Sequence, residues 1–286
     1  MTGNTLGWVI VAFVLYLLMM IAIGAFYAKG NNNSEDYFLG GRKLNGFVAA
    51  LSAQASDMSG WLLMGLPGAI YLTGVGGDGW IAIGLFIGTT LNWLFIATKL
   101  RRYTIRANNS VTLPTYFENR FHDEKKVLMT VSSITIVVFF LVYCASALSA
   151  GGQLFESVFG IDYHVALTIG ALVVLVYTFL GGFTAVCVTD FIQGMLMLVG
   201  ILAVPLFAYH FLTTGGTTLS AGLEASGADS ANFLNLMKNG DGSNNIISVI
   251  SGLGWGLGYF GMPHILVRFM AVRDEKEMTK SKATAI

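Results

Sequence analysis

The sequence predicts an all-α membrane protein that crosses the bilayer several times. Of its 286 residues, 55% are hydrophobic and only 11% are charged, and the mean hydropathy is +0.68. Soluble domains carry roughly 25% charged residues, so a soluble protein of this length could not cover its surface with these charges. The apolar residues also gather in runs of roughly the 20 residues that a spanning helix needs.

Seven apolar runs are long enough to span the membrane. They are predicted at residues 6–28, 47–72, 79–98, 127–154, 165–181, 186–212 and 246–270. The first run has no basic stretch before it and is too long for the apolar core of a cleaved signal peptide, so we expect it to stay as a helix. The polar segment 213–245 is expected to be a long, mobile loop with one short helix near residues 231–237.

The basic residues predict the orientation of the chain. All lysines and arginines except Lys238 follow the first or third run, or lie at or after the end of the seventh. They are Lys29, Arg42 and Lys43; Lys99, Arg101, Arg102, Arg106, Arg120, Lys125 and Lys126; and Arg268, Arg273, Lys276, Lys280 and Lys282. The positive-inside rule places these segments in the cytoplasm and the N-terminus outside. The link "GGFTAVCVTD" between the fifth and sixth runs belongs to the same side and is expected to be a tight or partly buried turn.

Several function classes find no support in the sequence. Cys144 and Cys187 both fall in apolar runs and are expected to be small buried residues rather than a disulfide or metal pair. No His/Cys cluster has metal-ligand spacing, and there is no phosphate-binding loop, no nucleophile–base pair and no basic patch suited to nucleic acid. We therefore expect neither an enzyme nor an organic cofactor.

The second run contains a polar cluster near its middle. Asp57 lies there with Ser56, Ser59 and Gly60. An ionisable side chain in hydrocarbon costs roughly 2.5 to 3.5 kcal/mol on insertion scales, and it faces a cavity or a partner as a rule. Serine, aspartate and glycine are also poor residues for a helix interior. The cluster therefore predicts a local break, whose free carbonyls suit a small cation and whose helix N-terminus suits a carboxylate. A structural acid that ties helices together is the alternative.

The seventh run holds a second unusual stretch, "SGLGWGLGYFGMPH". Its glycines precede Pro263, which is expected to kink or break the helix, while Trp255 and Tyr259 are four residues apart and should share one helix face. Close helix packing through glycines, with an aromatic belt at the lipid interface, is the alternative.

Two further polar residues lie within apolar runs. Asp190 lies near the cytoplasmic end of the sixth run, where we expect its carboxylate to reach headgroup water. Tyr143 lies in "FFLVYCASA" of the fourth run and by itself is more typical of packing than of ligand binding.

Five segments resemble the sodium:solute symporter family. They are "YFLGGRKL", "SAQASDMSGWLLMGLPGA", "YCAS", "VYTFLGGFTAV" and "GWGLGYFGMPHILVRFMA". The resemblance extends over essentially the whole chain. It implies an extra N-terminal helix (1–28) and two inverted repeats of five helices, the first helix of each being broken. Residues 47–212 would form the first repeat and residues 246–271 would open the second. Family members have more spans than this chain holds, so we expect an N-terminal portion with a truncated second repeat.

The resemblance also implies a function. A secondary transporter in the plasma (inner) membrane would couple sodium movement to uptake of a small solute, with L-proline as the expected one. The alternatives are another small solute, a sensor derived from a transporter, or a fragment that is inactive without its second half.

Site residues follow from the same resemblance. Sodium would bind backbone carbonyls of Ala55 and Met58, with Asp57 nearby in a coupling role, and Asp190 would contribute to an extra sodium site. The solute-binding residues implied are Ser59, Gly60, Tyr143, Trp255, Tyr259 and Pro263. Arg42 would belong to an inner gate.

Overall fold

The computed structural model describes residues 3–286 and the side chains from residue 7 onward. Within that part the chain is helical almost throughout and contains no β-strand. The first elements are α1 (Gly3–Ala28), α2 (Ser34–Leu39), η1 (Gly40–Arg42), α3 (Gly46–Asp57), η2 (Trp61–Gly65), α4 (Leu66–Thr73), α5 (Val75–Leu91), η3 (Asn92–Ala97), α6 (Thr98–Arg106) and α7 (Leu113–Phe121). They are followed by α8 (Val127–Phe159), α9 (Tyr163–Thr214), α10 (Leu219–Ala225), α11 (Ser230–Phe233), α12 (Ile246–Gly254), η4 (Trp255–Phe260), α13 (Pro263–Ala271) and α14 (Glu275–Ala285).

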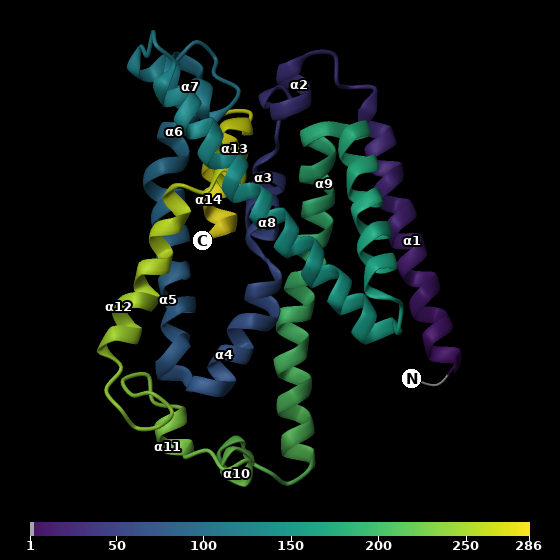
Figure 1. Ribbon diagram of the computed structural model, residues 1–286, viewed down its shortest axis with the longest axis vertical. Coiled ribbons are helices and arrows are strands. Elements are labelled where there is room, and N and C mark those ends of the chain that lie inside the picture. The colour runs from purple at the N-terminus through teal and green to yellow at the C-terminus, as the bar shows by residue number, and fades with distance from the viewer. Residues whose placement is uncertain (1–2) are drawn as a thin grey trace.

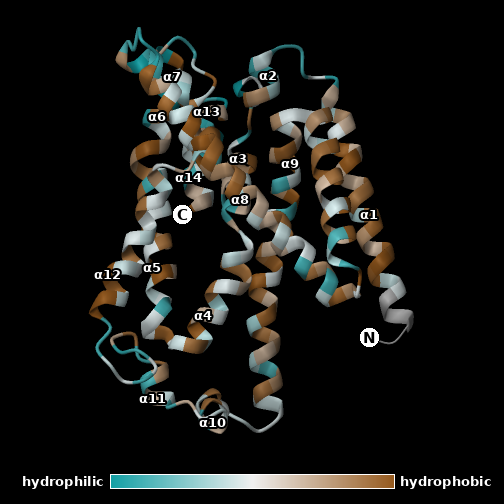
Figure 2. Cartoon of the chain, viewed as in Figure 1, coloured by the Kyte–Doolittle hydropathy of each residue, from teal (hydrophilic) through white to brown (hydrophobic). Residues whose placement is uncertain are grey.

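Long apolar helices dominate the molecule. Four helices are long and apolar enough to cross a membrane, and the bent pair Ile246–Phe260 and Pro263–Ala271 makes a fifth candidate. Figure 2 shows apolar residues along α1, α8 and α9, whereas the segments around α7 and between α10 and α12 are more polar. This arrangement is that of a multi-pass membrane protein.

Helix α9 is a helical hairpin. Its regular backbone is interrupted at Gly182, whose φ of 60° and ψ of −158° reverse the chain, and the two arms run side by side (Figure 1). The arms correspond to the predicted runs 165–181 and 186–212. Gly182 is buried, and a Cβ there would lie 2.9 Å from the carbonyl oxygen of Tyr37. The turn is therefore tight and buried, and only glycine fits it.

The predicted second run is broken near its middle. Helix α3 ends at Asp57, Met58 has a non-helical ψ of 89°, and helical structure resumes with the π-helical turn η2 before α4. Serine, aspartate and glycine weaken the helix at this point, as the sequence indicates. The break separates α3, which packs on α9, α13 and α14, from α4, which packs on α5.

The third run is longer than expected. One helix continues through α5, η3 and α6, from Val75 to Arg106. Four basic residues that the sequence placed in a loop are therefore helical: Lys99, Arg101, Arg102 and Arg106. Polar contacts stabilise this extension, because the Arg101 Nε donates to the carbonyl of Val272 (2.7 Å) and Arg102 pairs with Glu275 (2.6 Å).

The seventh run also bends, by 44° between η4 and α13. Its glycines allow close packing on α5, which runs beside α12 in Figure 1: a Cβ on Gly256 would lie 2.2 Å from the Gly84 oxygen. Trp255 and Tyr259 do not share one environment, which corrects the prediction from their spacing. Trp255 is 45% exposed whereas Tyr259 is 3% exposed. The reason is that η4 is a 3₁₀-helix, in which residues three apart, not four, lie on one face.

The polar segment between α9 and α12 contains two short helices, α10 and α11, where the sequence predicted one. Asp229 caps α11 by accepting from the backbone N–H groups of Ala231 and Asn232. Asn245 anchors the end of the segment, because its side-chain amide donates to the carbonyls of Gly76 and Leu236, each at 2.7 Å.

Candidate functional site

The two broken segments meet α8 at a cavity of about 320 Å³. Its walls come from the end of α3, from η2, from the middle of α8 and from the bend between η4 and α13. The lining residues are Asp57, Ser59, Gly60, Trp61, Leu62, Leu85, Tyr143, Ser146, Ala147, Ala150, Trp255, Met262 and His264. Five of the residues that the sequence singled out therefore lie around one space: Asp57, Ser59, Gly60, Tyr143 and Trp255.

A hydrogen bond between Tyr259 and Asp57 joins the two broken segments. The Tyr259 hydroxyl donates to Oδ2 of Asp57, the last residue of α3. The backbone carbonyl of Tyr259 accepts a bond of 2.9 Å from the side chain of Asn92, which is fully buried. Tyr259 is not itself among the residues that line the cavity. Its hydroxyl holds the Asp57 carboxylate in place, so the acid has a hydrogen-bond partner on the other broken segment.

Aromatic side chains form part of the cavity wall. The rings of Trp61 and Trp255 stack with centroids 5.8 Å apart and planes 12° apart. Tyr143 reaches the break from α8, since its hydroxyl donates to the carbonyl of Ser56 at 3.5 Å. The cavity therefore combines flat aromatic faces with a carboxylate, which suits a small molecule that has both apolar and polar parts.

The backbone at the break carries the predicted sodium ligands. The Met58 N–H donates to the carbonyls of Gln54 (3.3 Å) and Ala55 (3.2 Å). A carbonyl oxygen has two lone pairs, so this contact leaves capacity on Ala55 for a cation. No group of three His, Cys, Asp or Glu residues within residues 3–286 could hold a metal.

Gly60 and Pro263 take different positions in the site. A Cβ on Gly60 would lie 3.0 Å from the Ala150 Cβ, so the break packs closely on α8. Pro263 is the first residue of α13, where its missing N–H costs nothing. It lines a separate, largely apolar cavity of about 570 Å³ between α7, α8 and α13, and not the cavity that holds Asp57.

Asp190 does not reach headgroup water, which corrects the expectation from its place in the sequence. Its Oδ2 pairs with Arg268 at 2.8 Å and accepts from the hydroxyls of Ser52 (2.7 Å) and Ser56 (3.1 Å). The side chains of Asp190 and Arg268 are 13% and 7% exposed. This pair could not be predicted from the sequence, because Arg268 lies 78 residues from Asp190 along the chain. The pair ties α9 to both broken segments.

Arg42 occupies a buried crossing point at the basic end of the molecule. Its guanidinium donates to the Met270 carbonyl (2.7 Å), the Ser110 carbonyl (2.8 Å) and the Asn109 side chain (2.9 Å). Burial lowers the pKa of Arg42, and the Glu35 carboxylate at 3.6 Å opposes that shift. The residue thus holds η1, the segment after α6, and the end of α13 together.

Among the lining residues that were not singled out from the sequence, His264 and Trp61 contribute aromatic rings to the wall. The His264 ring stacks on Tyr143 at 5.6 Å, and neither of its ring nitrogens has a hydrogen-bond partner in the described part of the chain. A histidine within an apolar run is itself a signal, because ionisable residues in spans are rare. Trp61 directly follows the polar cluster of the second run, so its position also pointed to the break.

The fold and this site define the class of the chain: a multi-pass membrane protein whose broken helices meet at a small, largely apolar cavity that holds one carboxylate, as in secondary transporters. The chain belongs to the sodium:solute symporter family, whose family model matches residues 37–286.

Curated relatives agree with this assignment. The sodium/proline symporter of Salmonella typhimurium is 48% identical over 96% of this chain, and that of Escherichia coli 46% over 96%. The high-affinity proline transporter PutP of Bacillus subtilis is 47% identical over 92% of the chain. Each match covers 53–54% of the relative, so the chain spans about half the length of these proteins.

A solved structure shows the same fold. It is a Na⁺-coupled sialic acid symporter in a substrate-bound, outward-open state, with a TM-score of 0.75 and 20% sequence identity. The alignment covers 94% of this chain and 55% of that one. The long helices, the break in α3 and the bend before α13 are thus arranged in a fold already known from a sodium-coupled transporter.

Proposed function

We propose that the complete protein carrying this chain takes up L-proline together with sodium across the plasma (inner) membrane. Three curated relatives whose names include proline are 46–48% identical to nearly the whole chain. The single observation that carries the proposal is the cavity where both broken segments and Tyr143 converge. Its volume of about 320 Å³ lies at the small end of the range of about 300–1,000 Å³ for ligand pockets.

Sodium binds at the break in this proposal. The carbonyls of Ala55 and Met58 are its ligands from this chain, because the helix ends there and leaves carbonyl oxygens with lone pairs to spare. Asp57 sets the local field and, through Tyr259, transmits the state of the break to the seventh run. Asp190 already balances Arg268, so the proposal keeps the cation at Ala55 and Met58 and does not include a second sodium at Asp190.

L-Proline occupies the neighbouring space. Its ring packs on Trp255 and Tyr143, and its charged groups meet the break near Ser59 and Gly60. The helix that restarts after the break presents its N-terminal end to the cavity, which favours a carboxylate. Tyr259 and Pro263 act indirectly: Tyr259 holds Asp57, and Pro263 sets the direction of α13.

Coupling follows from the shared elements. Sodium and proline both favour the arrangement in which the break is ordered, so each raises the affinity for the other by the same factor. Inward movement of one sodium is worth about 2.3 kcal/mol per 100 mV of membrane potential.

The proposal includes topology and repeats. The basic segments are cytoplasmic and the N-terminus is outside, because nearly all lysines and arginines lie at one end of the spans. Residues 47–212 form one five-helix repeat and residues 246–271 open the second, inverted one. The two breaks are then the corresponding first helices of the repeats.

Calorimetric titration of the complete protein in detergent tests the binding part. We expect L-proline to bind in sodium chloride and to bind at least tenfold more weakly in potassium chloride. In sodium chloride, Trp255→Ala should bind proline more weakly than the unaltered protein. Equal affinity in both salts would exclude the sodium assignment. Binding of another small amino acid in preference to proline would exclude the solute.

A further inference from the structure

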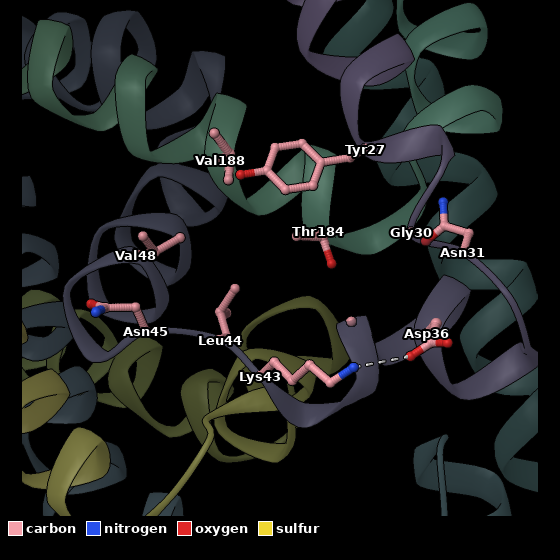
Figure 3. Close-up of a pocket in the computed structure, with 11 residues that line it drawn as sticks. Tyr27, Gly30, Asn31, Asp36, Lys43, Leu44, Asn45, Val48, Thr184 and Val188 are labelled. Carbon is pink, nitrogen blue, oxygen red and sulfur yellow. Dashed lines mark ion pairs between the residues drawn. The ribbon is translucent and has the colours of Figure 1, made fainter.

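A second cavity, of about 410 Å³, lies away from the site just described, where several spanning segments end. It lies among the C-terminal end of α1, the segment α2–η1, the first turn of α3 and the turn of α9. Figure 3 shows Tyr27, Thr184 and Val188 on one side and Lys43, Leu44 and Asp36 on the other. The complete lining is Tyr27, Gly30, Asn31, Asp36, Gly40, Lys43, Leu44, Asn45, Val48, Thr184 and Val188.

The depth of this cavity follows from the helices around it. Helix α1 ends at Ala28, α3 begins at Gly46, and α9 reverses at Gly182. Three apolar segments thus have an end beside one cavity, which places it at the level of the lipid headgroups. Large aromatic side chains are exposed nearby, as is typical of a membrane interface: Phe26 is 75%, Phe38 57% and Phe47 52% exposed.

Two charged side chains in the cavity wall, Lys43 and Asp36, form a loose ion pair (Figure 3). The Lys43 ammonium and the Asp36 carboxylate lie 3.9 Å apart, too far for a hydrogen bond, and neither side chain forms one within residues 7–286. The Lys43 side chain is 78% exposed and that of Asp36 is 16% exposed. A cation and an anion therefore border one space without a hydrogen bond between them.

These charges select one kind of ligand. An anion alone would be repelled by Asp36, and a cation alone by Lys43. A zwitterion whose two charges are a few bonds apart matches both. Leu44, Val48 and Val188 add apolar side chains to the cavity wall, and further apolar side chains are exposed around it. A zwitterion that carries acyl chains therefore fits better than a free solute.

We propose that this cavity binds the headgroup of an aminophospholipid, a phosphoethanolamine ester. Lys43 donates to the phosphate oxygens, and the lipid ammonium donates to the Asp36 carboxylate. A choline headgroup has no N–H donor for Asp36, and a glycerol headgroup has no cation. The headgroup would link α1 to the start of α3, the helix that ends at the break.

Native mass spectrometry of the complete protein tests this proposal without measuring transport. The protein is purified in detergent, mixed with equal amounts of phosphatidylethanolamine, phosphatidylglycerol and phosphatidylcholine, and the retained lipid is identified. We expect one phosphatidylethanolamine per chain to be retained in preference to the other two. Lys43→Glu should reduce that fraction by about tenfold, the loss expected for a hydrogen bond to a charged group.

Lys29→Glu is the matched control, because Lys29 also follows α1 but does not line the cavity. It should retain the lipid like the unaltered protein, and size-exclusion chromatography verifies that each variant is folded. Retention of all three lipids alike, or an equal loss in Lys29→Glu, would overturn the proposal. So would displacement of the lipid by soluble glycerophosphoethanolamine at equal concentration, since the site would then take a free zwitterion.

Discussion

Asp57 is the acid that the two broken segments share. It ends α3 and accepts a hydrogen bond from Tyr259 of η4. Asp57→Asn keeps the side-chain size and one acceptor oxygen but removes the charge. We expect the sodium concentration for half-maximal proline uptake to rise at least tenfold, because the field at Ala55 and Met58 becomes less negative.

Uptake measured at a series of sodium concentrations checks this expectation. Asp78→Asn is the control, because Asp78 lies at the polar end of α5 and accepts from Thr73. An unchanged sodium dependence in Asp57→Asn would show that the acid has only a structural role.

His264 lies in the cavity wall with two buried ring nitrogens that have no partner in the described residues. His264→Phe keeps the stack on Tyr143 and removes both polar atoms. An unsatisfied buried polar group costs about 1–3 kcal/mol, so the melting temperature without ligand should not fall. We expect proline affinity to fall, because the ring loses its hydrogen-bonding atoms at the cavity. A lower melting temperature with unchanged proline affinity would show that the nitrogens are paired elsewhere in the complete protein.

At the scale of elements, the Asp190–Arg268 pair connects three helices. Both side chains are mostly buried, and Arg268 also donates to the Ser52 hydroxyl at 3.0 Å. Removing one partner of a buried pair costs about 3–5 kcal/mol, whereas replacing both with apolar groups is often neutral. Asp190→Leu should therefore lower the melting temperature strongly, and Asp190→Leu with Arg268→Met should recover most of the loss. A double variant no more stable than Asp190→Leu would contradict the pairing.

The hairpin turn of α9 gives a second test at this scale. Gly182→Ala places a Cβ 2.9 Å from the Tyr37 carbonyl at a positive φ, so it should destabilise the protein by more than about 1 kcal/mol. Gly200→Ala on the second arm has open space and should be neutral. Thermal unfolding of the two variants compares them directly, and equal melting temperatures would argue against the tight turn.

Some of the elements could be predicted from the sequence and others could not. Hydropathy located the spans, and the residues around Asp57 located the break, because both depend on local composition. The prediction that Trp255 and Tyr259 share one helix face was wrong, because η4 is a 3₁₀-helix and the sequence does not distinguish a 3₁₀ turn from an α turn.

The contacts of Asp190 and Pro263 could not be predicted from the local sequence pattern. The partner of Asp190 comes from a distant helix, and Pro263 was assigned to the cavity by resemblance but lines a neighbouring space. Contacts of this kind depend on how helices pack, which no single segment specifies. His264 was overlooked although a histidine in an apolar run is itself an informative residue.

For the whole molecule, the charge distribution predicts which end is cytoplasmic. In a variant without Cys144 and Cys187, a single cysteine at Thr217 should react in intact cells with a membrane-impermeant thiol reagent, because the proposed topology places the segment after α9 outside. A cysteine at Lys125 should react only after the membrane is opened. The reverse pattern would invert the topology.

The central claim is that the complete protein couples sodium to L-proline. Its most direct test is uptake of labelled proline into proteoliposomes, with an inward sodium gradient and, in parallel, with equal sodium on both sides. The account predicts accumulation above the external concentration only with the gradient, and its loss when potassium replaces sodium. Accumulation that is indifferent to sodium, or no proline uptake by active protein, would contradict it.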